Sequence, residues 1–181
     1  MSTTSGAGPE RVDAYANAIL EIAKGEDLLE RVTNELFHFA RAVERSEELR
    51  QTITNQDIPP EKRQAIIEEL VGLKSSPLTT SLVSFVVGVG RARELVKIID
   101  KLVERSAAEQ DREVAQIRSA MPLDDEQKER VGKALGSALG KQLDVRVVID
   151  PSVIGGLVAR VGDTVIDASV RNRLDQIRES L

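Results

Sequence analysis

The chain has 181 residues, of which 41% are hydrophobic and only 2% aromatic, so it is long enough for one large or two small domains with an aliphatic core. It contains no cysteine and carries a formal net charge of -5, which excludes disulfides and cysteine-ligated metals and argues against binding of nucleic acid, because phosphate contacts need a basic face. No apolar run reaches the roughly 18 residues of a membrane span and the first residues lack the features of a signal peptide, so we expect a soluble cytoplasmic protein.

The first two predicted elements are amphipathic helices. Gly8-Pro9 is a typical helix start and Gly25 a typical stop, and the apolar residues between them share one stripe: Val12, Tyr15, Ala16, Ile19, Leu20 and Ala23. Asp27 and Glu30 have the spacing of a capping box, which predicts Asp27 as the N-cap of a second helix. Its apolar face comprises Leu28, Val32, Leu36, Phe39, Ala40 and Val43.

Two short helices are predicted next. Ser46 is expected to cap a third helix, which carries Leu49 and Ile53. Pro59-Pro60 then breaks the chain. A fourth helix follows and ends at Gly72, and its apolar face consists of Ile66, Ile67, Leu70 and Val71.

The fifth and sixth helices complete the first hundred residues. Ser76-Pro77 is a typical helix start, and the apolar residues after it lie nearly all round the helix, as in the middle of a bundle: Leu78, Leu82, Val83, Phe85, Val86, Val87 and Val89. After Gly88 and Gly90 the amphipathic pattern resumes and predicts a long helix to about Glu109. Six helical segments joined by short loops indicate an all-α bundle.

A change of composition marks the predicted domain boundary. The segment from Ser106 to Arg112 is polar, and we interpret it as a hinge without an apolar anchor. The expected organisation is a disordered N-terminus (residues 1–8), a helical bundle domain (residues 9–108) and a small α/β domain (residues 109–181). The predicted fold class is therefore α+β.

The second domain begins with a segment of mixed character. Residues 113–120 suit both a helix and a strand, whereas the alternation from Val145 to Ile149 predicts a strand. Between them, Asp124 and Gln127 have capping-box spacing before a helix that carries Val131, Leu135, Ala138 and Leu139. Glycine stands at every fourth position of this helix, which indicates close packing against a sheet: Gly132, Gly136 and the closing Gly140.

The final stretch predicts a hairpin and a last helix. Residues 157–161 and 164–166 are short alternating runs, and Gly162-Asp163 between them suits a type II′ turn. Ser169 can cap a helix whose apolar face is Val170, Leu174, Ile177 and Leu181. The small domain is therefore expected to contain a mixed sheet of three or four strands and two helices.

The sequence lacks complete motifs for nucleotide binding, metal binding or catalysis. Gly88-Val89-Gly90 begins like a dinucleotide fingerprint, but Arg93 stands where the third glycine belongs and a helix precedes the motif. His38 is the only histidine and has no companion ligands for a metal. The sequence also lacks a Gly-Lys-Ser/Thr phosphate loop. We predict no catalytic residues, no cofactor and no metal.

Several motifs resemble those of one known family. They are Ala14-Tyr15-Ala16-Asn17-Ala18, Gly90-Arg91, Ser119-Ala120-Met121-Pro122-Leu123, Ile149-Asp150, Gly155-Gly156, Gly162-Asp163 and Val165-Ile166-Asp167-Ala168-Ser169-Val170. On these residues nearly the whole chain resembles the delta subunit of bacterial rotary (F-type) ATP synthase, a relative of the mitochondrial oligomycin-sensitivity-conferring protein. The resemblance implies a helical bundle followed by a small α/β domain, and it makes residues 113–120 a strand.

The resemblance also implies a mechanical role without catalysis. Delta subunits connect the catalytic head to the peripheral stalk, so that proton-driven rotation is coupled to ATP synthesis. In that family the helical domain holds the N-terminal helix of an alpha subunit, and the C-terminal domain meets the C-terminal part of the b subunit. The protein would then be a peripheral stator subunit at the cytoplasmic face of the bacterial membrane, in touch with the membrane only through the complex.

A partner helix needs an apolar trough between two helices. The resemblance places it between the first and fifth helices, lined by Tyr15, Ala18, Ile22, Leu82, Val86 and Val89. On periodicity alone, Tyr15, Leu82 and Val86 fit the core of the bundle better than a partner surface.

A second set of residues is expected to be structural, namely Gly90, Gly155, Gly156, Gly162, Asp163 and Asp167. Within it, Gly155-Gly156 indicates a bulge or a close backbone approach rather than contact with a partner. The alternative function is an unrelated cytoplasmic helical adaptor, or a small-molecule enzyme, with the same architecture.

Overall fold

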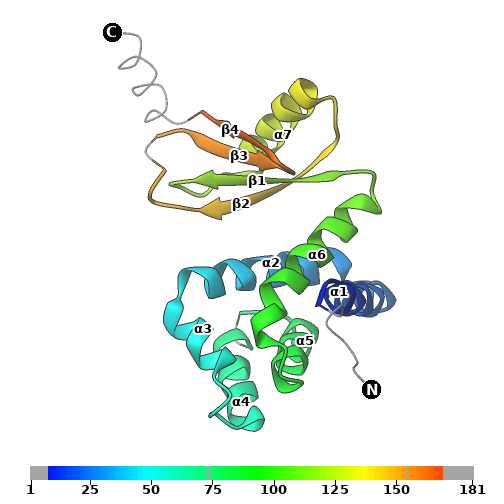
Figure 1. The fold of residues 1–181 in the computed structure, drawn as a ribbon. Coiled ribbons are helices and arrows are strands. Elements are labelled where there is room, and N and C mark those ends of the chain that lie inside the picture. The colour runs from blue at the N-terminus through cyan, green and yellow to red at the C-terminus, as the bar shows by residue number, and fades with distance from the viewer. Residues whose placement is uncertain (1–7, 73, 154, 169–181) are drawn as a thin grey trace. The chain divides into compact units, whose positions relative to one another are not determined.

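The structure is a computed structural model that describes residues 8–72, 74–153 and 155–168. The chain divides into two compact units, Met1–Ser106 and Ala107–Leu181 (Figure 1). The described part of the first unit is helical, and that of the second combines a four-stranded sheet with a helix. The predicted α+β class is confirmed. Whether the two units fold independently, with the expected boundary near residue 108, stays a prediction.

The first two helices are α1 (Gly8–Gly25) and α2 (Leu29–Arg45). The predicted stripe of α1 is confirmed, because its central residues are buried: Ala16, Ile19, Leu20 and Ala23. The prediction that Asp27 caps α2 is wrong, since Leu28 is the N-cap and there is no side-chain capping hydrogen bond. Asp27 instead has a φ of +55°, and its N–H donates to the Lys24 carbonyl at 3.0 Å.

The role of Asp27 is to end α1. The N–H of Leu28 reaches back to the Ala23 carbonyl at 2.9 Å, which together with the Asp27 bond forms a Schellman motif around a left-handed residue. Asp tolerates that conformation better than most residues. The sharp reversal between two adjacent helices therefore overrides the local capping-box signal.

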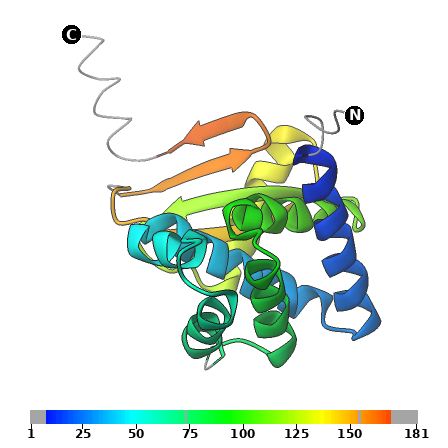
Figure 2. The same ribbon diagram turned by 60° about the horizontal axis from the view of Figure 1, so that its bottom comes forward.

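The remaining helices of the first unit follow the predicted order. They are α3 (Glu47–Thr54), α4 (Pro60–Val71), α5 (Pro77–Gly88), the short 3-10 helix η1 (Ala92–Glu94) and α6 (Leu95–Ala108). Ser46 accepts a hydrogen bond from the Leu49 N–H at 3.1 Å, which confirms it as the cap of α3. Figure 2 shows α4 beside α5, the most extensive helix pair of the bundle. Their core includes Ile67, Val71, Val83, Val86 and Val87.

The segment between the units differs in part from the predicted hinge. Helix α6 continues through Ser106 and Ala107, and both residues are buried. The exposed connection is therefore shorter and starts at Glu109. Asp111 has a φ of +54°, and the N–H of Arg112 donates to the Ala107 carbonyl at 3.0 Å, so α6 ends in the same way as α1.

Limited proteolysis is expected to cut this connection first among residues 8–168. Glu109 and Arg112 lie in an exposed turn, which is the kind of site that proteases prefer. Brief digestion with Glu-C protease or trypsin, followed by mass spectrometry, should yield a helical fragment that ends at Glu109 or Arg112. Initial cleavage within α2 to α6 would contradict the boundary.

The second unit is built on one mixed sheet. Its strands are β1 (Glu113–Ser119), β2 (Leu143–Ile149), β3 (Leu157–Val161) and β4 (Thr164–Asp167), in the order β2-β1-β3-β4. β1 pairs with β2 in parallel, and the other two pairs are antiparallel. The strand at residues 113–119 that the family resemblance implied is confirmed. The parallel pair needs a crossover, which α7 (Asp125–Leu139) provides.

Helix α7 covers the apolar face of the sheet. The buried strand residues Ala115, Ile117, Ala159 and Val161 form the core, and α7 adds Val131, Leu135 and Leu139. The predicted capping box is confirmed, because the Gln127 N–H donates to Asp124 Oδ1 at 2.7 Å and the Asp124 N–H to Gln127 Oε1 at 3.0 Å. A Cβ at Gly132 would lie 2.9 Å from the Val145 side chain, so this glycine permits the predicted close packing.

The hairpin of the second unit has the predicted turn. Val161 and Thr164 pair across it, and Gly162 has a φ of +55° whereas Asp163 does not take a positive φ. A positive φ at the first turn residue alone is the type II′ pattern. The helix predicted for Ser169–Leu181 lies outside the described residues. So does the predicted disordered N-terminus, apart from Gly8, which begins α1.

Candidate partner-binding surface

Two aromatic rings connect α1 and α5 at the surface of the first unit. The ring centroids of Tyr15 and Phe85 lie 6.3 Å apart with an interplanar angle of 46°, a tilted arrangement within the range of favourable aromatic pairs. Tyr15 is half-buried, whereas the side chain of Phe85 is 54% exposed. A large aromatic side chain this exposed is the kind of residue that marks binding surfaces.

Further apolar side chains lie on the same helix faces as this pair. Ala18 and Ile22 follow Tyr15 at helical spacing on α1, and Val89 follows Phe85 by four residues. Ile22 is 45% exposed and Val89 46% exposed. We call these residues the α1/α5 surface: Tyr15, Ala18, Ile22, Phe85 and Val89.

Two of the predicted lining residues do not reach this surface. Leu82 and Val86 are buried within the bundle, so their assignment to a partner-binding trough is corrected. Phe85, which the sequence prediction did not include, is the exposed aromatic residue of α5. Because α5 is apolar nearly all round, its sequence contains no signal for the exposed side, and the packing of α5 against α4 and α2 decides it.

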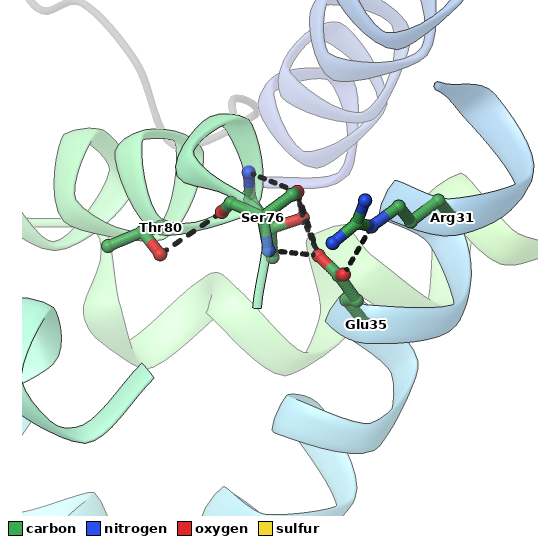
Figure 3. Close-up of polar contacts among 5 residues, drawn as sticks. Arg31, Glu35, Ser76 and Thr80 are labelled. Atoms are coloured by element: carbon green, nitrogen blue, oxygen red, sulfur yellow. Dashed lines mark hydrogen bonds and ion pairs between the residues drawn. The ribbon is translucent and has the colours of Figure 1, made fainter. Parts of the chain in front are cut away.

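The start of α5 is attached to α2 by one carboxylate (Figure 3). Glu35 Oε2 accepts hydrogen bonds from the Ser76 N–H at 2.8 Å, from Ser76 Oγ at 2.8 Å and from Thr79 Oγ1 at 2.6 Å. Arg31 Nε, one turn earlier on α2, donates to Glu35 Oε1 at 2.9 Å. Ser76 is also the N-cap of α5 and accepts from the Thr79 N–H at 3.3 Å. We call these four residues the Glu35 cluster.

The Glu35 cluster stabilises the ionised carboxylate. Burial alone raises the pKa of Glu35, but the hydrogen bonds from Thr79, Arg31 and Ser76 outweigh it and lower the pKa from 4.5 to about 2. Ser76 and Thr79 are both buried. The Ser76 N–H and the two hydroxyl groups donate to Glu35 in place of water, and the hydroxyl groups also lie 2.9 Å from each other. Removing the shared acceptor leaves a buried donor unbonded, which is costly.

The end of α5 depends on Gly90. Its φ is +78°, its N–H donates to the Val87 carbonyl at 3.1 Å, and the Arg91 N–H donates to the Val86 carbonyl at 3.0 Å. This is a Schellman motif with glycine at the left-handed position. The left-handed backbone conformation of Gly90 is a physical reason for its predicted structural role. The motif also fixes the position of Val89, the C-cap residue of α5.

Gly90→Ala is expected to lower the free energy of unfolding by about 1–2 kcal/mol, the cost of a left-handed conformation for a residue with a Cβ. No atom lies within 4 Å of the added Cβ, so steric contact contributes nothing. Gly25→Ala is the matched control, because that site is equally open but helical, and alanine there should be neutral or stabilising. Urea unfolding followed by circular dichroism measures both. Equal losses in the two variants would contradict the backbone explanation.

Arg105 attaches α1 to α6. Arg105 Nη2 lies 2.7 Å from Asp13 Oδ1, and Arg105 Nη1 also donates to Asn17. The hydrogen bond from Arg105 lowers the pKa of Asp13. Asp13 and Asn17 flank Tyr15 in sequence, so this contact holds the part of α1 that carries the ring.

The other predicted motif residues lie in the second unit. Gly155 and Gly156 are exposed between β2 and β3, with φ values of +58° and +98°, conformations that favour glycine. Asp163 lies in the hairpin turn and Asp167 ends β4. Their structural role stays a prediction.

The described residues offer neither a metal site nor a membrane-spanning helix. Within residues 8–72, 74–153 and 155–168, no cluster of His, Cys, Asp and Glu could hold a metal ion. In the same ranges, no helix has the length and apolar character needed to cross a membrane.

Comparisons with known proteins all match one family. The family model of the ATP synthase delta (OSCP) subunit matches residues 12–181. The ATP synthase subunit delta of Streptomyces griseus is 36% identical over 168 residues, which cover 92% of this chain and 62% of the relative. That of Nocardia farcinica is 36% identical over 164 residues, which cover 91% of this chain and 61% of the relative. The chain thus spans about three fifths of the length of these relatives.

A solved structure agrees with the sequence comparisons. A chain in the cryo-EM structure of the Toxoplasma gondii mitochondrial ATP synthase hexamer is similar, with a TM-score of 0.54 and 27% sequence identity. The match covers 93% of this chain and 96% of that chain.

Proposed function

Because the chain belongs to the ATP synthase delta (OSCP) subunit family, we propose that it is a non-catalytic connector in the stator of an F-type ATP synthase. It links the catalytic head to the peripheral stalk and so keeps the head from turning with the rotor. In this role it is a peripheral subunit at the cytoplasmic face of the bacterial membrane, and proton-driven rotation is coupled to ATP synthesis through it. The match to this family argues against the alternative of an unrelated adaptor or enzyme.

The helical unit receives the N-terminal helix of an alpha subunit on the α1/α5 surface. The observation that carries this proposal is the exposure of Ile22, Phe85 and Val89 beside the Tyr15–Phe85 ring pair. An amphipathic helix that covers these side chains buries apolar area from both partners. Fully burying an exposed apolar side chain is worth about 1.5–3 kcal/mol. Because Ile22, Phe85 and Val89 are already about half buried in the free chain, together they contribute roughly 2–5 kcal/mol before the costs of association.

A titration tests this contact directly. A synthetic peptide of the alpha-subunit N-terminal helix, from the ATP synthase that contains this chain, is added to the full chain in a calorimeter at pH 7. A peptide of the same composition in scrambled order is the control. Saturable one-to-one binding of the native peptide alone is expected. Absence of saturable binding would contradict the α1/α5 surface as the alpha-subunit site.

The second unit meets the C-terminal part of the b subunit. Cross-linking can test this cleanly, because the chain has no cysteine and single cysteines can be placed at will. Met121→Cys and Val165→Cys introduce a thiol at exposed positions of the second unit, and Leu70→Cys does so on α4. With a photoactivated cross-linker in the assembled complex, adducts with b are expected from positions 121 or 165. Adducts with b from position 70 alone would contradict the assignment.

A further inference from the structure

Helix α2 is the common support of the two helices that form the α1/α5 surface. Both α1 and α5 pack on α2, and the Tyr15–Phe85 ring pair joins them at the surface. The distance between the two aromatic anchors therefore depends on how α5 is held on α2. Any group that fixes α5 on α2 also shapes the surface.

The Glu35 cluster is such a group. All three donors to Glu35 Oε2 belong to the cap and first turn of α5, and the bond from Arg31 restrains the carboxylate from its own helix. Hydrogen bonds to a charged group are short and directional. On the α4 side, Gln64 Nε2 donates to the Ser84 carbonyl of α5 at 3.2 Å, a hydrogen bond to a neutral acceptor. The buried side chains of α5, Val83, Val86 and Val87, pack by the hydrophobic effect, which has no preferred direction. Between α2 and α5, the hydrogen bonds to the Glu35 carboxylate are the charge-assisted contacts that specify the position of α5.

We propose that Glu35 is a positioning residue for the α1/α5 surface, which clamps the first turn of α5 to α2 and thereby sets the place of Phe85 relative to Tyr15. The inference rests on the proposed binding of an alpha-subunit helix at this surface. Phe85 lies nine residues after Ser76, about 13 Å along the helix at 1.5 Å per residue. A tilt of about 10° at the clamp would move Phe85 by about 2 Å, more than a well-packed binding site tolerates.

The experiment compares the full chain with three variants, all at pH 7 and at a temperature where circular dichroism shows each to be folded. Glu35→Gln removes the charge, and Thr79→Val removes one donor with little change of shape. Glu69→Gln is the matched control, an exposed glutamate on α4. Tyr15 is the only tyrosine in the chain, so its ring resonances and their NOE to Phe85 report the geometry of the surface. Calorimetry with the alpha-subunit peptide reports affinity.

For Glu35→Gln we expect shifted Tyr15 resonances, a weaker NOE to Phe85 and about tenfold weaker peptide binding through lost preorganisation. Thr79→Val should show smaller changes of the same kind, and Glu69→Gln should match the wild type. Wild-type resonances and affinity in a folded but destabilised Glu35→Gln variant would overturn the proposal. Glu35 would then contribute to the stability of the fold and not to the geometry of the surface. If Glu35→Gln does not fold, the same criteria apply to Thr79→Val. If the wild type itself does not bind the peptide, the proposed function fails, and the Tyr15 signals still decide the positioning role.

Discussion

Glu35→Gln is expected to lower the free energy of unfolding by about 2 kcal/mol at pH 7. The lowered pKa of Glu35, about 2 against 4.5, means that the folded state favours the carboxylate, at roughly 1.4 kcal/mol per pKa unit. We take less than the full value because the side chain remains 17% exposed and solvent screens such pairs. Urea unfolding at 222 nm measures the difference, and Glu69→Gln should stay within about 0.5 kcal/mol of the wild type.

The pH dependence of this difference follows from the sign of the shift. A carboxyl group with a lowered folded-state pKa stabilises the protein fully above its unfolded value of 4.5 and loses that effect as the pH falls toward about 2. The gap between the wild type and Glu35→Gln should therefore be constant from about pH 6 upward and shrink steadily below about pH 5. A gap that does not change with pH would mean that the ionised carboxylate is not the stabilising species.

Phe85→Ser is expected to weaken binding of the alpha-subunit peptide by about 30-fold, the equivalent of about 2 kcal/mol for loss of a central aromatic anchor. Because Phe85 is already 54% exposed in the free chain, the same change should cost the fold itself less than about 1 kcal/mol. Calorimetric titration and urea unfolding separate the two effects.

Leu70→Ser provides the matched control for Phe85→Ser. Leu70 is 51% exposed on α4 in the same unit, so it loses a comparable apolar surface outside the α1/α5 surface. The control should bind the peptide as the wild type does. Equal loss of affinity in both variants would indicate a general effect of surface hydrophobicity and would contradict the proposed position of the site.

Local signals in the sequence predicted the elements well where a short stretch determines the geometry. Ser46 and Asp124 accept hydrogen bonds from N–H groups three residues away, so a spacing rule suffices to find them. Gly162 supplies the positive φ of a two-residue turn. Asp27 shows the limit of such rules, because the same spacing that predicted a cap is overridden by the reversal that ends α1.

The Glu35 cluster could not be found in this way. Glu35 and its partners on α5 are 41 to 44 residues apart in the chain, and no periodic pattern relates them. The prediction that Leu82 and Val86 line the surface failed for a different reason. Leu82, Phe85 and Val86 on α5 and its C-cap residue Val89 are all apolar, so their spacing and composition do not show which of them is exposed.

The sequence by itself therefore determined the helices, most of their caps, the strands of the described sheet and the resemblance to the delta subunit family, because each depends on neighbouring residues or on linear motifs. Only the tertiary structure decided that Phe85 faces solvent while Val86 is buried, and that Glu35 accepts hydrogen bonds from the start of α5. Burial and long-range hydrogen bonds depend on contacts between two or more helices. They exist only once α2, α4 and α5 have packed.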